Sequence, residues 1–278
     1  MNFNIKKIIF FFLYLIILFF NYNLFAELPA DIKKIIQKGK LVVAINSVDY
    51  PPFFYHNKHG NFEGYDIELA NDIAKFLGVK VEFNRSAGTF QDVVKLVQDE
   101  HADIAISAIS ATLSRGLNVR FSEPYLTPNQ CLILNRILEV KIGNKAKLNN
   151  DQLKVAVLSN SSYEDFFQQN ILYFDNIFKT KDFIKYNSLD KILKDVTEEK
   201  ILGFYADEIY ANHIIKNKKI ANIYVRKKII TDATDPISIA INWNSPNLAE
   251  WINLYIKKLK QSGKTKYLNN KYLRENND

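Results

Sequence analysis

The stretch YDIELANDIAKFLGVKVEF, Tyr65 to Phe83, decides the fold of this chain. Its first part carries a stripe of apolar residues at helical spacing, which is closed by Gly78. The stripe consists of Ile67, Leu69, Ala70, Ile73, Ala74 and Leu77. Its second part, VKVEF, alternates apolar and polar residues as a half-buried strand does. A helix that leads directly into a strand predicts an α/β unit.

The same alternation continues on both sides of this stretch. A strand, KLVVAIN, precedes it, and a second amphipathic helix, FQDVVKLVQDEH, and another strand, ADIAIS, follow it. The pattern restarts at LKVAVLSNSS, then passes through a helical YEDFFQQN, a strand ILGFYA and a helix DEIYANHIIKN. A strand-like PISIAIN precedes a last amphipathic helix from Pro246 onward. Two α/β units in series predict two lobes whose strands are covered by helices.

The first 26 residues differ from the rest. Two lysines in MNFNIKK precede thirteen apolar residues, Ile8 to Phe20, and NYNLFA ends on a small residue. This is the pattern of a secretory signal peptide, because a membrane-spanning helix needs about 20 apolar residues. We therefore predict a leader over residues 1–26 and an exported protein. An uncleaved membrane anchor is the alternative, since Leu24 is large for its place before the cut.

The composition excludes several classes of protein. The net charge of +7 is spread over short clusters such as KNKK and RKK, which are typical of solvated faces and not of a nucleic-acid interface. Cys131 is the only cysteine, so no internal disulfide can form, and it lies too deep in the chain to carry a lipid. An exported, disulfide-free protein that is not a lipoprotein favours the bacterial periplasm.

The sequence contains no motif for a catalytic centre, a cofactor or a metal. The patterns GxSxG, GxGxxG, HExxH and the P-loop are absent. His56 and His59 lie in a loop without a third ligand nearby. We predict no catalytic residue, no cofactor and no metal site.

Arg115 is the first candidate for ligand binding. It follows a strand end rich in hydroxyl groups, DIAISAISATLSR, and falls in the first turn of a predicted helix. A helix dipole disfavours a cation there by about 0.3–1 kcal/mol, so the arginine is easier to understand if an anion shares the site. The alternative is a surface arginine paired with a nearby acid.

Asp207 offers the opposite charge. It ends the strand ILGFYA and opens a helix, and ligands of open α/β sheets bind at the carboxyl ends of strands. An ordinary helix cap is the alternative, although one carboxylate oxygen can cap while the other accepts from an ammonium group. Tyr50 and Phe53 lie in the loop after the first predicted strand, and Phe90 begins the second predicted helix. Such aromatic residues are candidate ligand walls or parts of the core.

Five stretches of the chain together resemble the family 3 extracellular solute-binding proteins, the amino-acid receptors of ABC importers. These stretches are LVVAIN, YPPF, GNFEGYDIELANDIAKFLGVKVEF, DIAISAISATLSR and FSEPY. The resemblance covers nearly the whole mature chain. It implies a two-lobed periplasmic-binding-protein fold of type II with two hinge crossings. The implied lobes are residues 27–127 plus 233–278, and residues 128–232.

The resemblance also implies the roles of individual residues. The carboxylate-binding arginine falls on Arg115 and the ammonium-binding aspartate on Asp207. The stacking aromatics fall on Tyr50 and Phe90. The hydroxyl and backbone positions near the carboxylate fall on Ser107, Ala108, Ser110, Ser161 and Ser162. Asn160 stands where the family often has glycine, and asparagine tolerates positive φ.

The implied function is capture of an α-amino acid between the lobes and its delivery to an inner-membrane ABC permease, by a protein that is a monomer and not an enzyme. Relatives that bind basic amino acids often place a carboxylate at the position of Ser47, so we expect a polar or uncharged ligand side chain; the direction of Asp49 is open. The alternatives are a periplasmic cyclohexadienyl or arogenate dehydratase, with Asp49 or Glu208 as acid, a murein-cleaving enzyme, and a ligand-sensing module.

Overall fold

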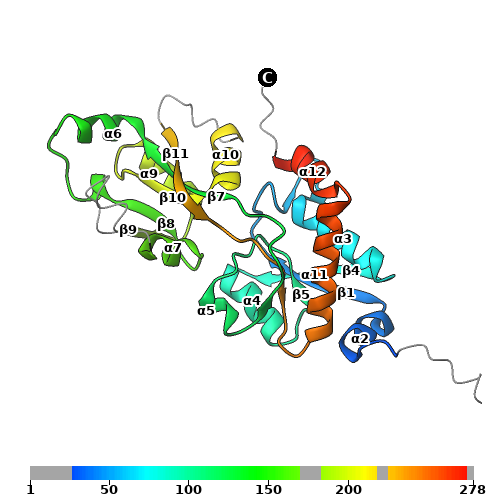
Figure 1. Cartoon of the computed structure of the whole chain (residues 1–278). Helices are drawn as coiled ribbons and strands as arrows, with labels where there is room; N and C mark the ends of the chain where they lie inside the picture. Colours follow the sequence, from blue (N-terminus) through cyan, green and yellow to red (C-terminus); the bar gives the residue numbers. More distant parts are fainter. Residues whose placement is uncertain (1–26, 170–182, 218–224, 274–278) are drawn as a thin grey trace, which may run out of the picture.

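The computed structural model describes residues 27–169, 183–217 and 225–273. The chain forms two α/β lobes, each built on a five-stranded sheet. Figure 1 shows the lobes side by side, joined near β7 (Asn129–Asn135) and β11 (Val225–Thr234). The predicted two-lobed α/β fold is confirmed. The predicted leader, residues 1–26, lies outside the described residues.

The first sheet has the strand order β4-β1-β5-β12-β6. Its strands are β1 (Lys40–Asn46), β4 (Lys80–Ala87), β5 (Ile104–Ala105), β6 (Arg120–Phe121) and β12 (Ala240–Ile241). Strand β1 runs parallel to β4 and β5, whereas β12 is antiparallel to β5 and β6. The chain therefore returns from the second lobe to add a strand to the first sheet.

Helices flank this sheet, and a small hairpin lies in the loop after β1. The helices are α2 (Ala30–Lys38), α3 (Tyr65–Phe76), α4 (Phe90–Gln98), α5 (Leu113–Gly116), α11 (Pro246–Gln261), α12 (Lys264–Leu268) and the π-helical η2 (Asn269–Leu273). The hairpin pairs β2 (Tyr55–His56) with β3 (Phe62–Glu63). The predicted helices of this lobe are confirmed as α3, α4 and α11, although α4 ends at Gln98 and not at the predicted His101; the predicted strands β1 and β4 are also confirmed.

The second sheet has the order β11-β7-β10-β8-β9. Besides β7 and β11 it contains β8 (Val155–Leu158), β9 (Phe183–Tyr186) and β10 (Gly203–Asp207). Strands β8, β9 and β10 are parallel, and β7 is antiparallel to both β10 and β11. The helical elements of this lobe are α6 (Arg136–Gly143), η1 (Asp151–Leu153), α7 (Tyr163–Gln169), α9 (Leu189–Thr197) and α10 (Glu208–Asn217).

Three strands of the second sheet, β7, β9 and β11, have no counterpart in the sequence-based prediction. Strand β7, NQCLILN, is an apolar run buried between β10 and β11, and it lacks the alternation that marks a half-buried strand. Strand β11 contains the cluster RKK, which we expected on a solvated face. It is the edge strand of the sheet, where charged side chains are common because they discourage pairing with other chains.

Two predicted strands are shorter than expected. ADIAIS and PISIAIN each contribute only two residues, as β5 and β12. After β5 the backbone leaves the sheet, because Ala108 has a left-handed φ of 48°. The loop that follows β5 at this point faces the other lobe.

Gly64 positions the loop that precedes α3. Its φ is 138°, and a Cβ atom there would lie 2.2 Å from the carbonyl oxygen of Phe53. Only glycine fits this close backbone approach. The contact fixes the loop Tyr50–Phe54 against the start of α3, and so sets where Tyr50 lies.

Within residues 27–169, 183–217 and 225–273, no helix is both long and apolar enough to cross a membrane.

Candidate functional site

A small cavity lies between the two lobes, where the loops after β5 and β8 and the end of β10 meet. Ten residues line it: Tyr50, Phe90, Ala108, Ser110, Arg115, Ser161, Ser162, Tyr163, Asp207 and Asp235. They include eight of the nine residues predicted as ligand-binding, all except Ser107. The cavity volume is about 10 Å³, enough for about one water molecule. Side chains of the two lobes therefore nearly fill this space.

The loop after β5 is held from behind by Asp66. This buried carboxylate accepts hydrogen bonds from the backbone N–H of Ala108 at 2.6 Å and from the hydroxyl of Tyr125 at 2.8 Å. Burial raises the pKa of Asp66 to about 7, and the two hydrogen bonds oppose that rise. Asp66 thus supports the strained φ of Ala108 and fixes the shape of this wall of the cavity.

Arg115 lies in the short helix α5, which Thr112 caps by accepting from the Arg115 backbone N–H at 3.3 Å. Its side chain is only 5% exposed, and its Nη1 donates to the carbonyl oxygen of Ser110 at 3.1 Å. It forms no ion pair within 4.0 Å with any described residue. Burial lowers the pKa of Arg115, and the charge of Asp235 opposes the shift. A buried guanidinium with spare donors is suited to bind an anion.

Asp207 ends β10 on the opposite wall, and it is 2% exposed. One carboxylate oxygen accepts from the backbone N–H of Tyr210 at 2.9 Å, which confirms the predicted helix cap. The other accepts from the hydroxyl of Tyr163 at 2.8 Å. Burial raises the pKa of Asp207, against the effect of these hydrogen bonds.

Tyr50 connects the two lobes. Its ring stacks on Tyr210 with a centroid distance of 4.0 Å and meets Phe90 edge-on at 5.5 Å. Its hydroxyl lies 2.9 Å from that of Tyr163. Because Tyr163 donates its own proton to Asp207, Tyr50 donates to Tyr163. A chain of hydroxyl groups therefore runs from Tyr50 in one lobe to Asp207 in the other.

The loop after β8 supplies the second contact between the lobes. Asn160 has a φ of 55°, so asparagine adopts the left-handed conformation expected of it at this turn. The hydroxyl of Ser161 donates to the carbonyl oxygen of Leu158 at 2.5 Å, within the loop. The hydroxyl of Ser162 instead lies 2.7 Å from that of Ser110.

Ser107 lies behind the cavity wall. Its hydroxyl accepts from the backbone N–H of Asn46 at 3.0 Å, which ties the loop after β5 to the end of β1. The side chain is fully buried and does not line the cavity.

Sequence reasoning missed Asp235, which comes directly after β11. Its backbone N–H donates to the carbonyl oxygen of Pro128, so the carboxylate stands where the two crossings between the lobes lie side by side. One oxygen accepts from Ser110 at 2.9 Å; the other, Oδ1, is buried without a hydrogen bond of good geometry among the described residues, although the Gln130 amide interacts with the carboxylate. Burial, and next the charge of Asp207, raise the pKa of Asp235 to about 7. A lone acid before a proline at a strand end gave no pattern that sequence reasoning could use.

The carboxylates that the sequence suggested as acids lie elsewhere. Asp49 forms an ion pair with Arg85 at 2.8 Å and accepts from the backbone N–H of His56. Glu208 pairs with Lys227 at 2.9 Å. Neither lines the cavity, because both side chains turn toward cations outside it.

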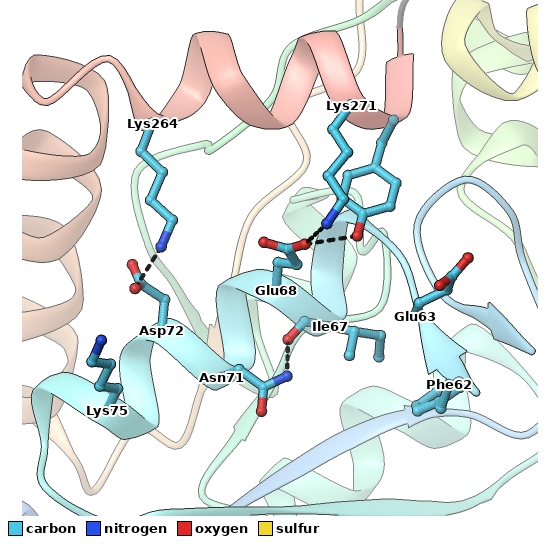
Figure 2. A pocket seen from close by; sticks show the side chains of 10 residues that line it. Phe62, Glu63, Ile67, Glu68, Asn71, Asp72, Lys75, Lys264 and Lys271 are labelled. Atoms are coloured by element: carbon cyan, nitrogen blue, oxygen red, sulfur yellow. Dashed lines mark hydrogen bonds and ion pairs between the residues drawn. The ribbon is translucent and has the colours of Figure 1, made fainter.

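A larger hollow of about 400 Å³ lies on the first lobe, between α3 and the last helices (Figure 2). Its charges are already matched: Asp72 pairs with Lys264 at 2.5 Å, and Glu68 pairs with Lys271. Asn71 donates to the carbonyl oxygen of Ile67 within α3. The charged side chains of this hollow are therefore less available to a ligand, although the hollow is the larger of the two. In the cavity between the lobes, the buried charges of the described residues form no ion pairs with one another.

No metal site emerges from the described part of the chain, because no three His, Cys, Asp or Glu side chains gather closely enough in it to hold an ion.

Comparison with known proteins supports a relationship over most of the chain. Residues 41–275 match the model of the bacterial extracellular solute-binding proteins, family 3. The chain is 23% identical over 235 residues to a probable histidine-binding protein of Neisseria gonorrhoeae, which covers 84% of this chain and 83% of the relative. It is 25% identical over 186 residues to the cyclohexadienyl dehydratase of Pseudomonas aeruginosa, which covers 65% of this chain and 68% of the relative.

Solved structures extend the similarity. The crystal structure of an ancestral amino acid-binding protein, a precursor of cyclohexadienyl dehydratase, is 26% identical to this chain with a TM-score of 0.69. The match covers 88% of this chain and all of that protein. Most of the named relatives are binding proteins.

Proposed function

Because the chain belongs to the bacterial extracellular solute-binding proteins of family 3, we propose that it captures an α-amino acid between its lobes and delivers it to an ABC importer. One juxtaposition carries the proposal. Arg115 of the first lobe and Asp207 of the second are both buried, and both line the same cavity. An α-amino acid carries a carboxylate for the arginine and an ammonium group for the aspartate, so one ligand satisfies both walls.

The proposed ligand contacts follow from the placement of the side chains. Arg115, Ser110 and Ser162 bind the carboxylate, with help from the backbone at Ala108 and Ser161. Asp207 binds the ammonium group, which replaces the Tyr163 hydroxyl on its second oxygen. Tyr50 and Phe90 pack against the ligand. Ser107 is a positioning residue, since its hydroxyl holds the backbone of Asn46.

Ligand entry requires the lobes to separate, because the cavity of about 10 Å³ is far smaller than an amino acid. We propose that residues 27–127 plus 233–278 move as one body and residues 128–232 as the other. The separation of their strands into two sheets supports this division. A ligand that touches both lobes then favours the closed arrangement over the open one.

A thermal-shift screen tests the proposal. The purified protein is melted with each common amino acid and with the amine that remains after decarboxylation. A ligand at a hundredfold its Kd adds about 2.7 kcal/mol of stability. We expect at least one amino acid to stabilise the protein while its amine does not. If no amino acid shifts the melting temperature, the proposal is wrong.

The similarity to cyclohexadienyl dehydratase favours a second candidate, a dehydratase on the same fold. Such an enzyme needs an acid that protonates the leaving hydroxyl group. In the cavity, Asp235 is the carboxyl group whose pKa is about 7, so it can hold a proton near neutral pH. Incubation with prephenate or arogenate decides the question: an aromatic product identifies an enzyme, whereas unchanged substrate leaves the binding protein.

The finer points of the function are part of the same proposal. We propose that the protein acts in the periplasm after removal of residues 1–26, as a monomer that is neither a lipoprotein nor an enzyme, and that it docks on an inner-membrane permease. Cell fractionation, N-terminal sequencing of the exported protein and its mass in solution test these points one by one.

A further inference from the structure

The cavity between the lobes contains more negative than positive charge. Among the described residues that line it, the charged side chains are Arg115, Asp207 and Asp235. With all three ionised, two carboxylates face one guanidinium. A zwitterionic amino acid leaves this excess unchanged, because its own charges cancel. A ligand with one further positive charge brings the closed cavity to neutrality.

Building on the proposed function, we propose that the cleft is specific for cationic α-amino acids, with Arg115 holding the ligand carboxylate and Asp207 and Asp235 together holding its two cationic groups. Asp235 is then a residue that determines specificity. This differs from the sequence-based expectation of an uncharged side chain, which took account of Ser47 and Asp49 only.

The hydrogen bonding of Asp235 supports this role. Its Oδ2 accepts from Ser110 at 2.9 Å, while its Oδ1 is buried without a hydrogen bond of good geometry among the described residues. The neutral amide of Gln130 interacts with the carboxylate and lowers its pKa, but it brings no positive charge. The side chain is 2% exposed, so bulk water reaches it poorly. A buried acceptor without a donor is costly, and most such atoms in proteins are satisfied. A cationic group of the ligand supplies the missing donor.

The electrostatic surroundings of Asp235 point the same way. Its carboxylate feels the negative charge of Asp207 and the positive charge of Arg115. The other titratable groups that feel its charge are Tyr163 and Tyr205, which stay neutral because their pKa values are raised. Among the described residues, therefore, no side chain forms an ion pair with the carboxylate of Asp207 or of Asp235. A second cation stabilises both, which a neutral ligand side chain cannot do.

The position of Asp235 on the backbone keeps this carboxylate in place. The two crossings between the lobes are hydrogen-bonded to each other here, from the N–H of Asp235 to the carbonyl oxygen of Pro128 at 2.9 Å. Two residues further on, Ile237 forms bridges with both Ser110 and Leu126. The carboxylate therefore stands on the floor of the cleft, beside the first lobe, and is presented to a ligand before the lobes close.

Matched ligand pairs test the proposal by calorimetry on the purified protein. Lysine is compared with norleucine, and arginine with citrulline, because each pair differs in little more than the charge of the side chain. We expect the cationic member of at least one pair to bind at least tenfold more tightly. Equal or tighter binding of the neutral members overturns the specificity but leaves the proposed function intact. Absence of binding by every amino acid overturns both.

The variant Asp235→Asn isolates the residue. It should weaken binding of the cationic ligand at least thirtyfold and leave the neutral partner within threefold, or make it tighter. The control is Asp165→Asn, because Asp165 also lies near Arg115 but is exposed and does not line the cavity. The control should keep the full preference for the cation. If Asp235→Asn also keeps the full preference for the cationic ligand, the assignment of Asp235 is wrong. If this variant fails to fold, the comparison of ligand pairs on the unaltered protein still decides the specificity.

Discussion

The hydroxyl groups of Ser110 and Ser162 lie 2.7 Å apart, although the two residues belong to different lobes. Since Ser110 donates its proton to Asp235, Ser162 donates to Ser110. This chain of hydrogen bonds mirrors the one from Tyr50 through Tyr163 to Asp207. Each buried carboxylate thus accepts from a hydroxyl group of its own lobe, and that hydroxyl accepts in turn from one of the opposite lobe. Both chains of hydroxyl groups line the cavity between the lobes.

Arg115→Ala should abolish tight binding without unfolding the protein. Loss of one partner of a buried charge pair costs about 2–5 kcal/mol of binding free energy. The ligand-free protein should melt at the same temperature or higher, because the buried guanidinium forms no ion pair there. Calorimetry and thermal melting measure the two effects.

The control for this variant is Arg120→Ala. Arg120 lies against the Trp243 ring, at 5.1 Å from its centroid, and does not line the cavity. It should leave the affinity unchanged. If both arginine variants bind the ligand as the parent protein does, Arg115 is not the carboxylate site.

Asp207→Asn should separate the two roles of this residue. Asparagine can still cap α10 by accepting from the Tyr210 N–H, so the free energy of unfolding should change by less than about 1 kcal/mol. The negative charge is lost, however, and affinity for the amino acid should fall by about 2–5 kcal/mol. Asp207→Ala should in addition lose the cap, at a further cost in stability of about 0.5–2 kcal/mol. Equal affinities for Asp207→Asn and the parent would contradict the ammonium assignment.

Asp66→Asn should lower both stability and affinity, although Asp66 does not line the cavity. An amide side chain cannot accept well from both the Ala108 N–H and the Tyr125 hydroxyl, so one buried donor is left unpaired at a cost of about 1–3 kcal/mol. The loop after β5 then holds Ala108 and Ser110 less firmly. Tyr125→Phe is the milder control, because it removes the hydroxyl donor and keeps the Ala108 contact. An unchanged affinity in Asp66→Asn would show that this support is not needed.

The stability of the ligand-free protein should fall as pH rises from about 4 to 7. The pKa values of Asp66 and Asp235 are about 7 in the folded chain, and an exposed aspartate has a value of 3.8. Between these values the folded state binds more protons than the unfolded state, so raising the pH favours unfolding. Urea denaturation at pH 5.5 and pH 7.5 measures the loss, and Asp235→Asn should reduce it. A steady gain in stability over this range would contradict the burial of these two carboxyl groups.

Affinity for a cationic amino acid should rise between pH 6 and pH 8. Asp235 has to lose its proton before it can bind a cation, and its pKa is about 7. Below that value the affinity should fall by up to about tenfold per pH unit. Calorimetry in two buffers of different ionisation enthalpy should detect the released proton at pH 6.5. Asp235→Asn should remove the proton release, and release that persists in this variant would point to another group.

The periodic parts of the fold could be predicted from the sequence. The helices α3, α4 and α11 follow from apolar spacing because each buries one stripe, and β4 follows from its alternation. Strands β1 and β10 are buried almost throughout and were predicted as short apolar runs next to a turn or a helix start. Strand β7 could not be predicted this way, because burial between two neighbouring strands removes its alternation. The short β5 and β12 end early because the chain turns toward the cleft, which apolar spacing does not record.

The sequence by itself determined the two-lobed α/β architecture, and it located Asp207 at the end of a strand and Arg115 in the first turn of the helix that follows one. These features depend on neighbours along the chain, and local patterns encode them. Only the tertiary structure decided that Asp235 joins them, that Ser107 lies behind the cavity wall, and that Asp49 and Glu208 turn away toward their own cations. These placements depend on how the return crossing packs against Pro128 and on which charges meet across the fold. The contacts join residues from 19 to 125 positions apart, and such contacts leave no local pattern.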